Sequence, residues 1–364
     1  MPKALPPLAI NGKFLAAQPT GVHRVAAELT HALCAIAQKR PGALDIQLWV
    51  PPDAAEAARA FDLPVRVITP LRHIAWEQLS IPLRDPERLL LNFCNIGPVL
   101  RANAITMIHD AQVYATPESY SRLFRMWYKG IQPILGRRNR AILTVSEHSR
   151  TEIAHHGVCD AGKIDVVHNG VDHILRVEAE PGIVARLGLE PGRYVVALAA
   201  TQAHKNIALL ARAFAHQRLA GLKLVLVGGT KREAFAASGI MLPANTVLSG
   251  RISDGELRAL YEAALCIAFP SRTEGFGLPP LEAMLLGCPA VVASCGALPE
   301  VCGAAALYAD ADDEEAWVAQ LCALADNPAL RARTSALGME QARQFTWARA
   351  AERLLEIVAE RAHG

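Results

Sequence analysis

Short apolar runs alternate with amphipathic segments along the first half of the chain. Seven runs have the length and composition of buried strands: 8–10, 46–50, 65–68, 89–93, 104–108, 141–145 and 164–167. A helix is expected to open at Gly21, because Val22, Val25, Ala26 and Leu29 recur at helical spacing. Shorter helical stretches are expected at 54–61 and 74–83. Strands that alternate with helices predict a parallel, doubly wound sheet.

The alternation stops in a polar stretch at 178–192 and then restarts. Five further strands are expected at 194–199, 224–227, 246–249, 267–269 and 290–293, and helices at 328–344 and 347–362 close the chain. A chain of 364 residues is long enough for two hydrophobic cores. We therefore predict two α/β domains, 1–180 and 181–345, followed by a terminal helix within 346–364.

The stretch 268–289 combines a strand, a loop with two glycines and a helix that starts at two prolines. Because proline suits the first turn of a helix, Pro279 and Pro280 mark that turn, and we expect the amides of the loop and of Leu281 and Glu282 to face a ligand. A helix start with exposed amides attracts phosphate.

Two carboxylates flank these amides, Glu274 before the glycines and Glu282 eight positions later. Carboxylates repel an anion, so we expect them to bind hydroxyl groups on a ligand that also carries phosphate. A nucleotide diphosphate sugar has both groups. The alternative is an ordinary strand-to-helix turn in which Glu282 favours the helix dipole.

Three other positions have a similar placement. Gly21 opens a helix and allows a phosphate to approach, although a simple loop-to-helix turn is equally compatible. Lys205 lies at a helix start, which disfavours a cation unless an anion binds there too. His109 follows the strand 104–108, at the edge where doubly wound sheets bind ligands; a structural histidine is the alternative.

Composition and charge narrow the function classes. The chain is 52% hydrophobic and 20% charged with a net charge of +2, so overall charge gives no support to nucleic-acid binding. Its eight cysteines contain no C-x-x-C pair, which favours reduced thiols in a cytoplasmic protein over a metal site. Neither a signal peptide nor a membrane-spanning run is expected.

The segment 121–140 carries six basic residues and no acidic one, interleaved with Phe124, Trp127 and Tyr128. One interpretation is an amphipathic helix with a solvated basic face. The other is a peripheral contact with an anionic membrane, in which the aromatic side chains enter the headgroup region. Nucleic acid is a weaker third interpretation, because no nucleic-acid-binding motif accompanies the segment.

An Asp-x-Asp pattern, Asp310 and Asp312, invites a divalent-metal hypothesis. Asp313 follows it, and a helix is expected from Glu314. Helix capping and first-turn charge explain these aspartates better, so no metal site is assigned.

The segment EGFGLPPLE, followed by GCPAVVASCGALPEV, resembles the signature of the retaining glycosyltransferases of family 4. VVHNGVD resembles the hinge of that family, IHD its histidine motif and FTWARAAERLLEIV its final helix. The resemblance implies the GT-B fold, in which two Rossmann-like doubly wound domains face each other across a cleft. It also implies that the last helix returns to the first domain.

The resemblance further implies transfer of a hexosyl unit with retention and without a cofactor or metal. Lys205 would bind the diphosphate together with the loop residues Gly275, Phe276, Gly277 and Leu278, and with Gly21. Glu282 would bind the ribose, Glu274 the transferred sugar, and His109 the sugar from the opposite wall. Many relatives have an arginine where this chain has Ala199; Arg251, in a loop that borders the base, and Arg272 are candidate substitutes.

The acceptor side is less defined. The segments INGKFLAAQPTGVHRVAAEL and IHDAQVYATPESY resemble bacterial mannosyltransferases of surface polysaccharide synthesis. This favours GDP-mannose as donor and a glycan or polyprenyl-diphosphate-linked acceptor at the inner face of the cytoplasmic membrane, with UDP-sugars and dTDP-rhamnose open. Two other functions remain open: a nucleotide-sugar epimerase of GT-B fold, and a non-catalytic partner of another glycosyltransferase.

Overall fold

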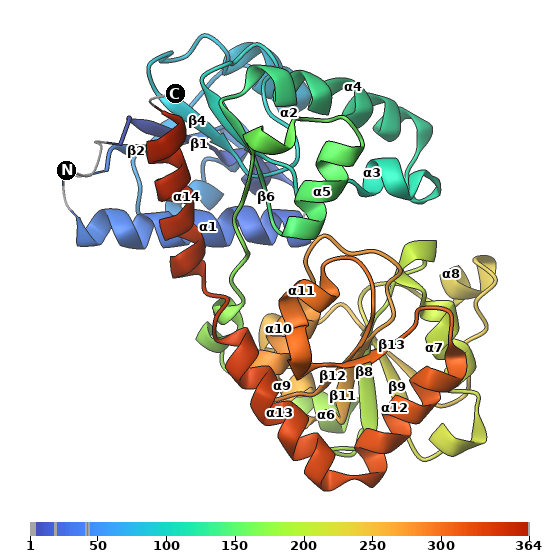
Figure 1. Ribbon diagram of the computed structural model, residues 1–364. Coiled ribbons are helices and arrows are strands. Elements are labelled where there is room, and N and C mark those ends of the chain that lie inside the picture. The colour runs from blue at the N-terminus through green and yellow to red at the C-terminus, as the bar shows by residue number, and fades with distance from the viewer. Residues whose placement is uncertain (1–4, 18–19, 41, 43, 363–364) are drawn as a thin grey trace. The chain divides into compact units, whose positions relative to one another are not determined.

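A computed structural model describes residues 5–17, 20–40, 42 and 44–362 and divides the chain into two compact units (Figure 1). The first unit runs to Gly170 and resumes at Thr346, and the second unit is Val171–Phe345. Each unit contains one parallel sheet.

The units divide ten residues before the predicted boundary at 180. The segment 171–180 belongs to the second unit because its backbone is bonded to helix α9 (Asp254–Ala263). The amide of Glu180 donates to the carbonyl of Gly255 (3.0 Å), and the guanidinium of Arg258 donates to the carbonyl of Val177 (2.7 Å).

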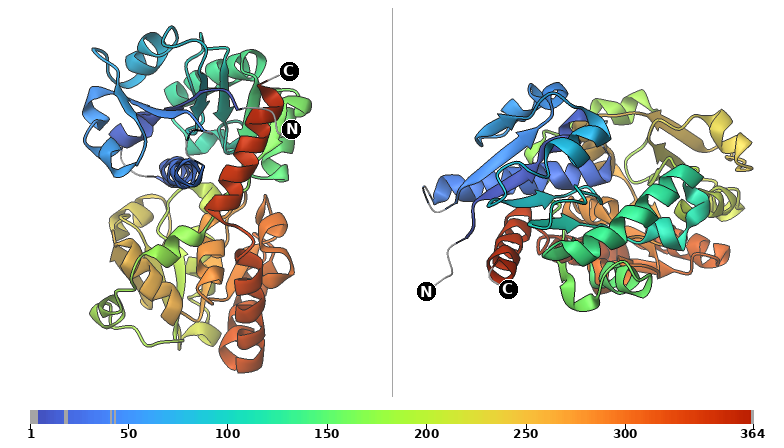
Figure 2. Two further views of the ribbon diagram at one scale, coloured as in Figure 1. Left: turned by 90° about the vertical axis from the view of Figure 1, so that its left-hand side faces the viewer. Right: turned by 90° about the horizontal axis from the view of Figure 1, so that it is seen from above.

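The first unit has a seven-stranded sheet in the order β3-β2-β1-β4-β5-β6-β7. Its strands are β1 (Leu8–Asn11), β2 (Ile46–Val50), β3 (Val65–Val67), β4 (Leu89–Asn92), β5 (Ala104–Met107), β6 (Ala141–Thr144) and β7 (Ile164–Val166). Its helices are α1 (Gly21–Lys39), α2 (His73–Ala75), α3 (Gln112–Ala115), α4 (Arg122–Arg138), α5 (Glu147–His155) and α14 (Trp347–Arg361). α14 packs against α1 (Figure 2).

The two shorter helical stretches expected in this unit form only in part. The region 54–61 contains the 3-10 turns Pro52–Ala54 and Ala57–Ala60. The region 74–83 contains α2 followed by a π-helical turn, Trp76–Ser80. Pro64 and Pro82, at the carboxyl-terminal ends of these regions, limit how far a helix can extend, since proline has no N–H to donate.

The second unit has a six-stranded sheet in the order β10-β9-β8-β11-β12-β13. Its strands are β8 (Tyr194–Leu198), β9 (Lys223–Val227), β10 (Thr246–Gly250), β11 (Cys266–Phe269), β12 (Ala290–Ala293) and β13 (Leu307–Ala309), the last of which was not predicted. Its helices are α6 (Gly182–Arg186), α7 (Ile207–Ala213), α8 (Arg232–Ala237), α9, α10 (Leu278–Leu285), α11 (Leu298–Cys302), α12 (Glu314–Asp326) and α13 (Pro328–Ala342).

Every strand pair in both sheets is parallel, which confirms the predicted fold class. In the first sheet the winding direction reverses between β1 and β4, and in the second between β8 and β11. Ligands of doubly wound sheets bind beyond the carboxyl ends of the strands at such a reversal. Each unit therefore has one favoured position for a site.

The two chain segments at the boundary between the units are tightly packed within their own units. In the first unit, a Cβ on Gly170 would lie 2.2 Å from the amide nitrogen of Trp347. In the second, the amide of Val171 donates to the carbonyl of Phe345 (3.0 Å). Glycine is required at position 170 because any side chain would collide with the start of α14.

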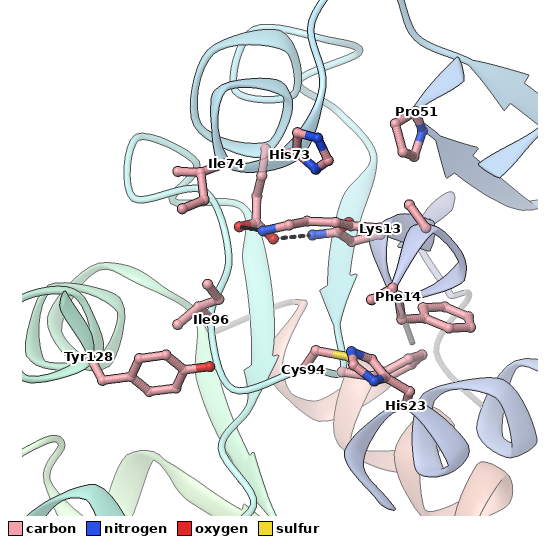
Figure 3. Close-up of a pocket in the computed structure, with 14 residues that line it drawn as sticks. Lys13, Phe14, His23, Pro51, His73, Ile74, Cys94, Ile96 and Tyr128 are labelled. Carbon is pink, nitrogen blue, oxygen red and sulfur yellow. Dashed lines mark hydrogen bonds and ion pairs between the residues drawn. The ribbon is translucent and has the colours of Figure 1, made fainter. Parts of the chain in front are cut away.

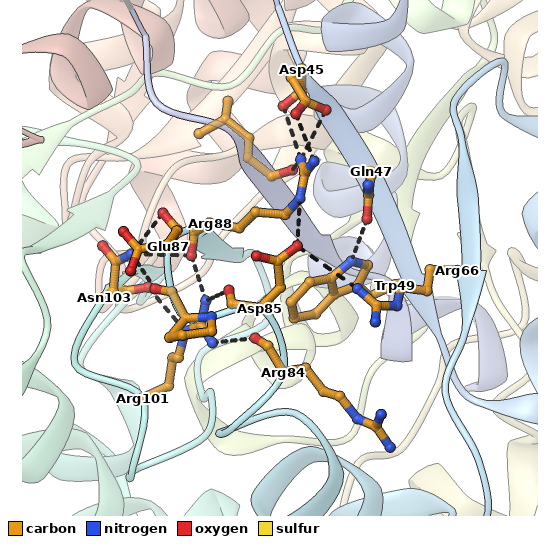
Figure 4. Close-up of polar contacts among 12 residues, drawn as sticks. Asp45, Gln47, Trp49, Arg66, Arg84, Asp85, Glu87, Arg88, Arg101 and Asn103 are labelled. Atoms are coloured by element: carbon orange, nitrogen blue, oxygen red, sulfur yellow. Dashed lines mark hydrogen bonds and ion pairs between the residues drawn. The ribbon is translucent and has the colours of Figure 1, made fainter.

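A polar clamp fixes the loop before β4 (Figure 4). The buried guanidinium of Arg101 donates to the backbone carbonyls of Arg84 (2.5 Å) and Asp85 (2.8 Å). Arg88 binds the carboxylates of Asp45 (2.6 Å) and Asp85 (3.0 Å). The Trp49 ring packs under the Arg101 guanidinium, 5.9 Å from the ring centroid. This clamp anchors the segment that follows the π-helical turn.

Candidate active site

Glycine shapes the loop between β11 and α10. Gly277 precedes the helix with a φ of 112°, and a Cβ there would lie 2.7 Å from Cδ2 of Leu298. Both the positive φ and the close approach require glycine. The neighbouring Phe276 is buried and packs edge-to-face on Phe345, with ring centroids 5.7 Å apart. The loop that holds Gly275 is therefore anchored at its carboxyl end.

Helix α10 starts earlier than predicted, at Leu278. The expectation that the amide of Leu281 is free is wrong, because this amide donates to the carbonyl of Gly277 (3.4 Å). Pro279 and Pro280 occupy the second and third helical positions and have no N–H. Among the first three residues of the helix, Leu278 alone has an amide to offer an anion.

The side chains of Lys205 and Glu274 meet at the reversal point of the second sheet. Nζ of Lys205 lies 2.7 Å from Oε1 of Glu274. Lys205 ends the 3-10 turn after β8, and Glu274 lies in the loop after β11, the strand beside β8. The Glu274 residue is 7% exposed, whereas a quarter of the Lys205 side chain is accessible. The Lys205 side chain therefore stays partly accessible while its ammonium is paired with Glu274.

The backbone of Glu274 is held by the segment after β12. Its carbonyl accepts the amide of Ala297 (3.0 Å), and a Cβ on Gly296 would lie 2.6 Å from its amide nitrogen. Gly296 also has a φ of 59°. Beside it, the thiol of Cys295 donates to the carbonyl of Ser271 (2.6 Å); burial raises the pKa of this thiol to about 12, so it stays protonated. Sequence reasoning missed this support, although a Cys-Gly pair one residue after a strand is a usable signal.

Glu282 is paired with a histidine that sequence reasoning missed. Oε1 of Glu282 lies 3.1 Å from Nε2 of His173, and both side chains are at most 9% exposed. Glu282 was expected in the first turn of α10, but it is the fifth residue of that helix. His173 follows the hinge motif in a 3-10 turn, Asp172–Arg176, and nothing in its sequence context indicates this contact.

Asn206 fixes the turn that carries Lys205. It adopts a left-handed φ of 55°, and its amide donates to the carbonyls of Pro270 (3.2 Å) and Ala311 (2.7 Å). Arg272, one candidate for a second cation, lies 3.5 Å from Oδ1 of Asn206 and pairs with Asp312 at 2.5 Å.

Arg251, the other candidate, follows β10 at the same edge of the sheet. Its guanidinium packs over Gly229, where a Cβ would lie 3.0 Å from Nε of Arg251. A Cβ on the preceding residue, Gly228, would lie 3.3 Å from the Cβ of Ala199. Arg251 also lines an open hollow of about 620 Å³. Arg251, an exposed residue, thus packs on the glycine pair that lies beside Ala199.

In the first unit, His109 is buried just after β5. Its Nε2 lies 2.8 Å from the carbonyl oxygen of Phe93, and its amide donates to Oδ1 of Asn95 (2.8 Å). Burial lowers the pKa of His109 to about 4, so the ring is neutral at pH 7. A carbonyl only accepts, so Nε2 carries the proton and Nδ1 is an acceptor.

Gly21 is the first residue of α1 and lies in the same unit as His109. A Cβ at Gly21 would meet no atom within 4 Å, so packing does not require glycine there. His23, on the same turn, is close enough that its charge contributes to the lowered pKa of His109. The structure thus brings the start of α1 and His109 to one region of the first unit.

The aspartates of the Asp-x-Asp pattern are accounted for by protein contacts. Asp310 accepts the amide of Asp312 (2.8 Å), and Asp312 pairs with Arg272. Asp313, which follows the pattern, caps α12 by accepting the amide of Ala316 (2.9 Å). The residues that the structure describes contain no cluster of three or more histidine, cysteine or acidic side chains suited to a metal.

Helix α4 exposes apolar and basic side chains together. Leu123 is 78% and Met126 72% exposed, and Phe124 and Trp127 are partly exposed. Among the described residues, no helix is long and apolar enough to cross a membrane.

Comparison with known proteins gives two family matches. The glycosyl transferases group 1 profile matches residues 184–341, and the glycosyltransferase family 4 profile matches residues 19–174. Together they cover most of both units.

The chain is 30% identical to O-antigen chain mannosyltransferase B of Escherichia coli, over 67% of each protein. It is 29% identical to O-antigen chain mannosyltransferase RfbU of Salmonella typhimurium, over 66% of each. It thus spans about two thirds of the length of these curated relatives. Among solved structures, the HepE protein of Anabaena in complex with UDP and glucose has a TM-score of 0.71 at 18% identity, and covers 98% of this chain and all of its own. This likeness concerns the fold.

Proposed function

Because the chain belongs to the glycosyltransferases of family 4 and has the GT-B fold, we propose that it is a retaining mannosyltransferase of surface polysaccharide synthesis. GDP-mannose is the favoured donor, and the acceptor is a glycan or a polyprenyl-diphosphate-linked sugar. The two O-antigen mannosyltransferases to which the chain is similar support this choice of sugar.

The contact between Lys205 and Glu274 is the observation that carries the proposal. The carboxylate of buried Glu274 and the ammonium of partly accessible Lys205 lie 2.7 Å apart at the reversal point of the second sheet. This places a positive and a negative group side by side where a ligand is expected. A sugar diphosphate needs both: a cation for the leaving diphosphate and a hydroxyl acceptor for the sugar.

Stabilisation of the departing diphosphate is the main catalytic requirement. Lys205 and the amide of Leu278 supply fixed positive charge and a donor, and Arg251 is the proposed second cation in place of the arginine absent at Ala199. Preorganised groups of this kind stabilise developing negative charge without reorganisation. We propose that no metal takes part.

The carboxylates act on either side of the diphosphate. Glu274 accepts hydroxyls of the transferred sugar, and its negative charge favours positive character at the anomeric carbon. Glu282 accepts the ribose hydroxyls. Neutral His109 accepts a sugar hydroxyl at Nδ1, and Gly21 leaves room for the diphosphate.

A lipid-linked acceptor implies that the enzyme acts at the inner face of the cytoplasmic membrane. Exposed Leu123 and Met126 on α4 lie among basic residues, which suits a peripheral contact with anionic lipid. Such a contact would place the enzyme where lipid-linked acceptors are found.

A ligand panel followed by a transfer assay tests the proposal. Thermal stability is measured with GDP, UDP, dTDP and their sugars, because a ligand of the native state raises the melting temperature. We expect the largest rise with GDP-mannose, and mannosyl transfer that EDTA leaves unchanged. No rise with any of these nucleotides would exclude the function, and loss of transfer with EDTA would exclude the metal-free mechanism.

A further inference from the structure

The first unit contains a pocket lined by polar and apolar side chains, at the reversal between β1 and β4 (Figure 3). Its volume is about 210 Å³, below the range of roughly 300–1,000 Å³ typical of sites for drug-sized ligands. It therefore has room for one small ring. Nothing in the family comparison assigns it a role.

One wall of the pocket is an ion pair between a partly exposed lysine and a buried glutamate. Glu77, which is 2% exposed, accepts Nζ of Lys13 at Oε2 (2.7 Å) and Nδ2 of Asn11 at Oε1 (2.9 Å). The charges of Lys13 and Glu77 cancel, so this ion pair adds no net charge that would favour an anion such as phosphate; His23 and His73 also line the pocket. A carboxylate has about four acceptor positions and an ammonium three donors, so the pair can still accept from and donate to hydroxyls.

The ion pair is held rigidly from behind. Asn11 donates to Oδ1 of Asn92 (2.9 Å), Asn92 donates to Thr106 (3.0 Å), and Thr106 donates to Asn139 (2.7 Å). These side chains are all buried. Glu77 lies on the π-helical turn, a geometry found often at functional sites. The polar clamp described above anchors the segment that follows this turn.

The other wall is apolar. Phe14, Phe93, Ile74 and Ile96 line it. Tyr128 points from α4 towards Ile96 and Cys94. Burial raises the pKa of Tyr128 to about 12, so its hydroxyl is neutral and can donate.

We propose that this pocket binds one neutral pyranose ring, the terminal sugar of the acceptor, with Glu77 and Lys13 bonded to adjacent hydroxyls. A sugar ring has hydroxyls at its rim and C–H groups on its faces, which matches a polar wall opposite an apolar one. The neutral ion pair selects a sugar over a phosphate or a nucleotide. The inference rests on the proposed transfer to a glycan, but the binding itself is measured without a donor.

The test measures, by saturation-transfer NMR, whether three glycosides bind to the full chain: methyl α-mannopyranoside, methyl α-glucopyranoside and methyl α-galactopyranoside. We expect at least one glycoside to bind, and Glu77→Gln to weaken it at least tenfold. The matched control is Asp165→Asn, which removes the carboxylate of another ion pair of this unit, with Arg361 (2.9 Å), and should leave binding unchanged. Ile74→Trp, at a half-exposed position, should block the pocket while the ion pair stays intact, should Glu77→Gln fail to fold.

The outcomes separate this inference from the proposed function. Absence of glycoside binding to the wild type, or equal binding by the wild type and Ile74→Trp, overturns the sugar pocket even if nucleotides still raise the melting temperature. Glycoside binding that both pocket variants lose supports the pocket, and it does so even if no nucleotide binds and the transferase assignment fails.

Discussion

Nε2 of His173 lies 3.1 Å from Oε1 of Glu282 in the interior of the second unit. This contact engages one oxygen of the Glu282 carboxylate and can hold the carboxylate in a single orientation. His173 is thus a positioning residue for the group proposed to bind the ribose.

We expect His173→Ala to weaken binding of the nucleoside diphosphate about tenfold, or about 1.4 kcal/mol, because Glu282 loses its orientation. His173→Gln, whose amide can still donate to Glu282, should restore most of the affinity. The decisive measurement compares GDP with 2′-deoxy-GDP by calorimetry. The wild type should prefer GDP, and His173→Ala should reduce this preference; an unchanged ratio would mean that the pair has only a structural role.

Lys205→Ala and Glu274→Ala should each abolish most of the transfer. We expect a loss of at least about 3 kcal/mol of transition-state stabilisation, more than a hundredfold in kcat/KM, with circular dichroism unchanged. Arg212→Ala is the matched control, because it breaks an ion pair of similar length in the same unit, with Glu314 (2.8 Å), at an exposed position. Wild-type rates in either site variant would end the assignment.

Gly21→Ala should impair function without harming the fold. The open space around this position predicts an unchanged free energy of unfolding, or a gain below about 1 kcal/mol from the better helix propensity of alanine. Gly277→Ala is the contrasting variant and should destabilise the protein, since its φ and the contact with Leu298 both exclude a Cβ. If Gly21→Ala binds the donor as tightly as the wild type, position 21 does not face the diphosphate.

Acid should destabilise the protein through His109. The pKa of His109 in the folded protein, about 4, is below the ordinary value of 6.5. Between these two pH values the unfolded chain therefore binds a proton at this histidine that the native state does not bind. Stability from this group is full above pH 6.5 and decreases as pH falls towards 4, by about 3 kcal/mol in total. His109→Asn, which cannot titrate, should show a flatter dependence of the free energy of unfolding between pH 7 and 4. Equal slopes would contradict the lowered pKa.

The apolar face of α4 should mediate membrane binding. We expect the protein to sediment with vesicles that contain phosphatidylglycerol, less so with phosphatidylcholine alone, and to dissociate as salt is raised. Leu123→Ser combined with Met126→Ser should reduce binding several-fold. Met241→Ser, at an 81% exposed position in the second unit, serves as control. Equal sedimentation of all three proteins would favour a solvated helix face.

The parallel sheets were predictable because their strands are continuous apolar runs at regular spacing. Lys205 was singled out as a cation at a helix start and Glu274 as a carboxylate beside the glycine loop, and the pairing of β8 with β11 brings the two together. The start of α10 was misplaced because Gly277, with its positive φ, ends the loop before the prolines, and sequence alone does not show which glycine does so.

Other features depend on contacts between distant side chains, which the hydrophobic periodicity of the sequence does not predict. His173 reaches Glu282 from more than a hundred positions away, and Glu77 lies on a π-helical turn within a stretch that was expected to be an ordinary helix. The pocket around Glu77 depends on residues from several separate segments, so local pattern could not reveal it.

The bond between the amide of Val171 and the carbonyl of Phe345 has a practical consequence for dissecting the enzyme. In chain topology the second unit is an uninterrupted insertion whose two ends are bonded to each other, so a fragment cut at 171 and 345 would keep this bond between its termini. Nucleotide capture by that fragment alone could then be measured apart from any acceptor chemistry.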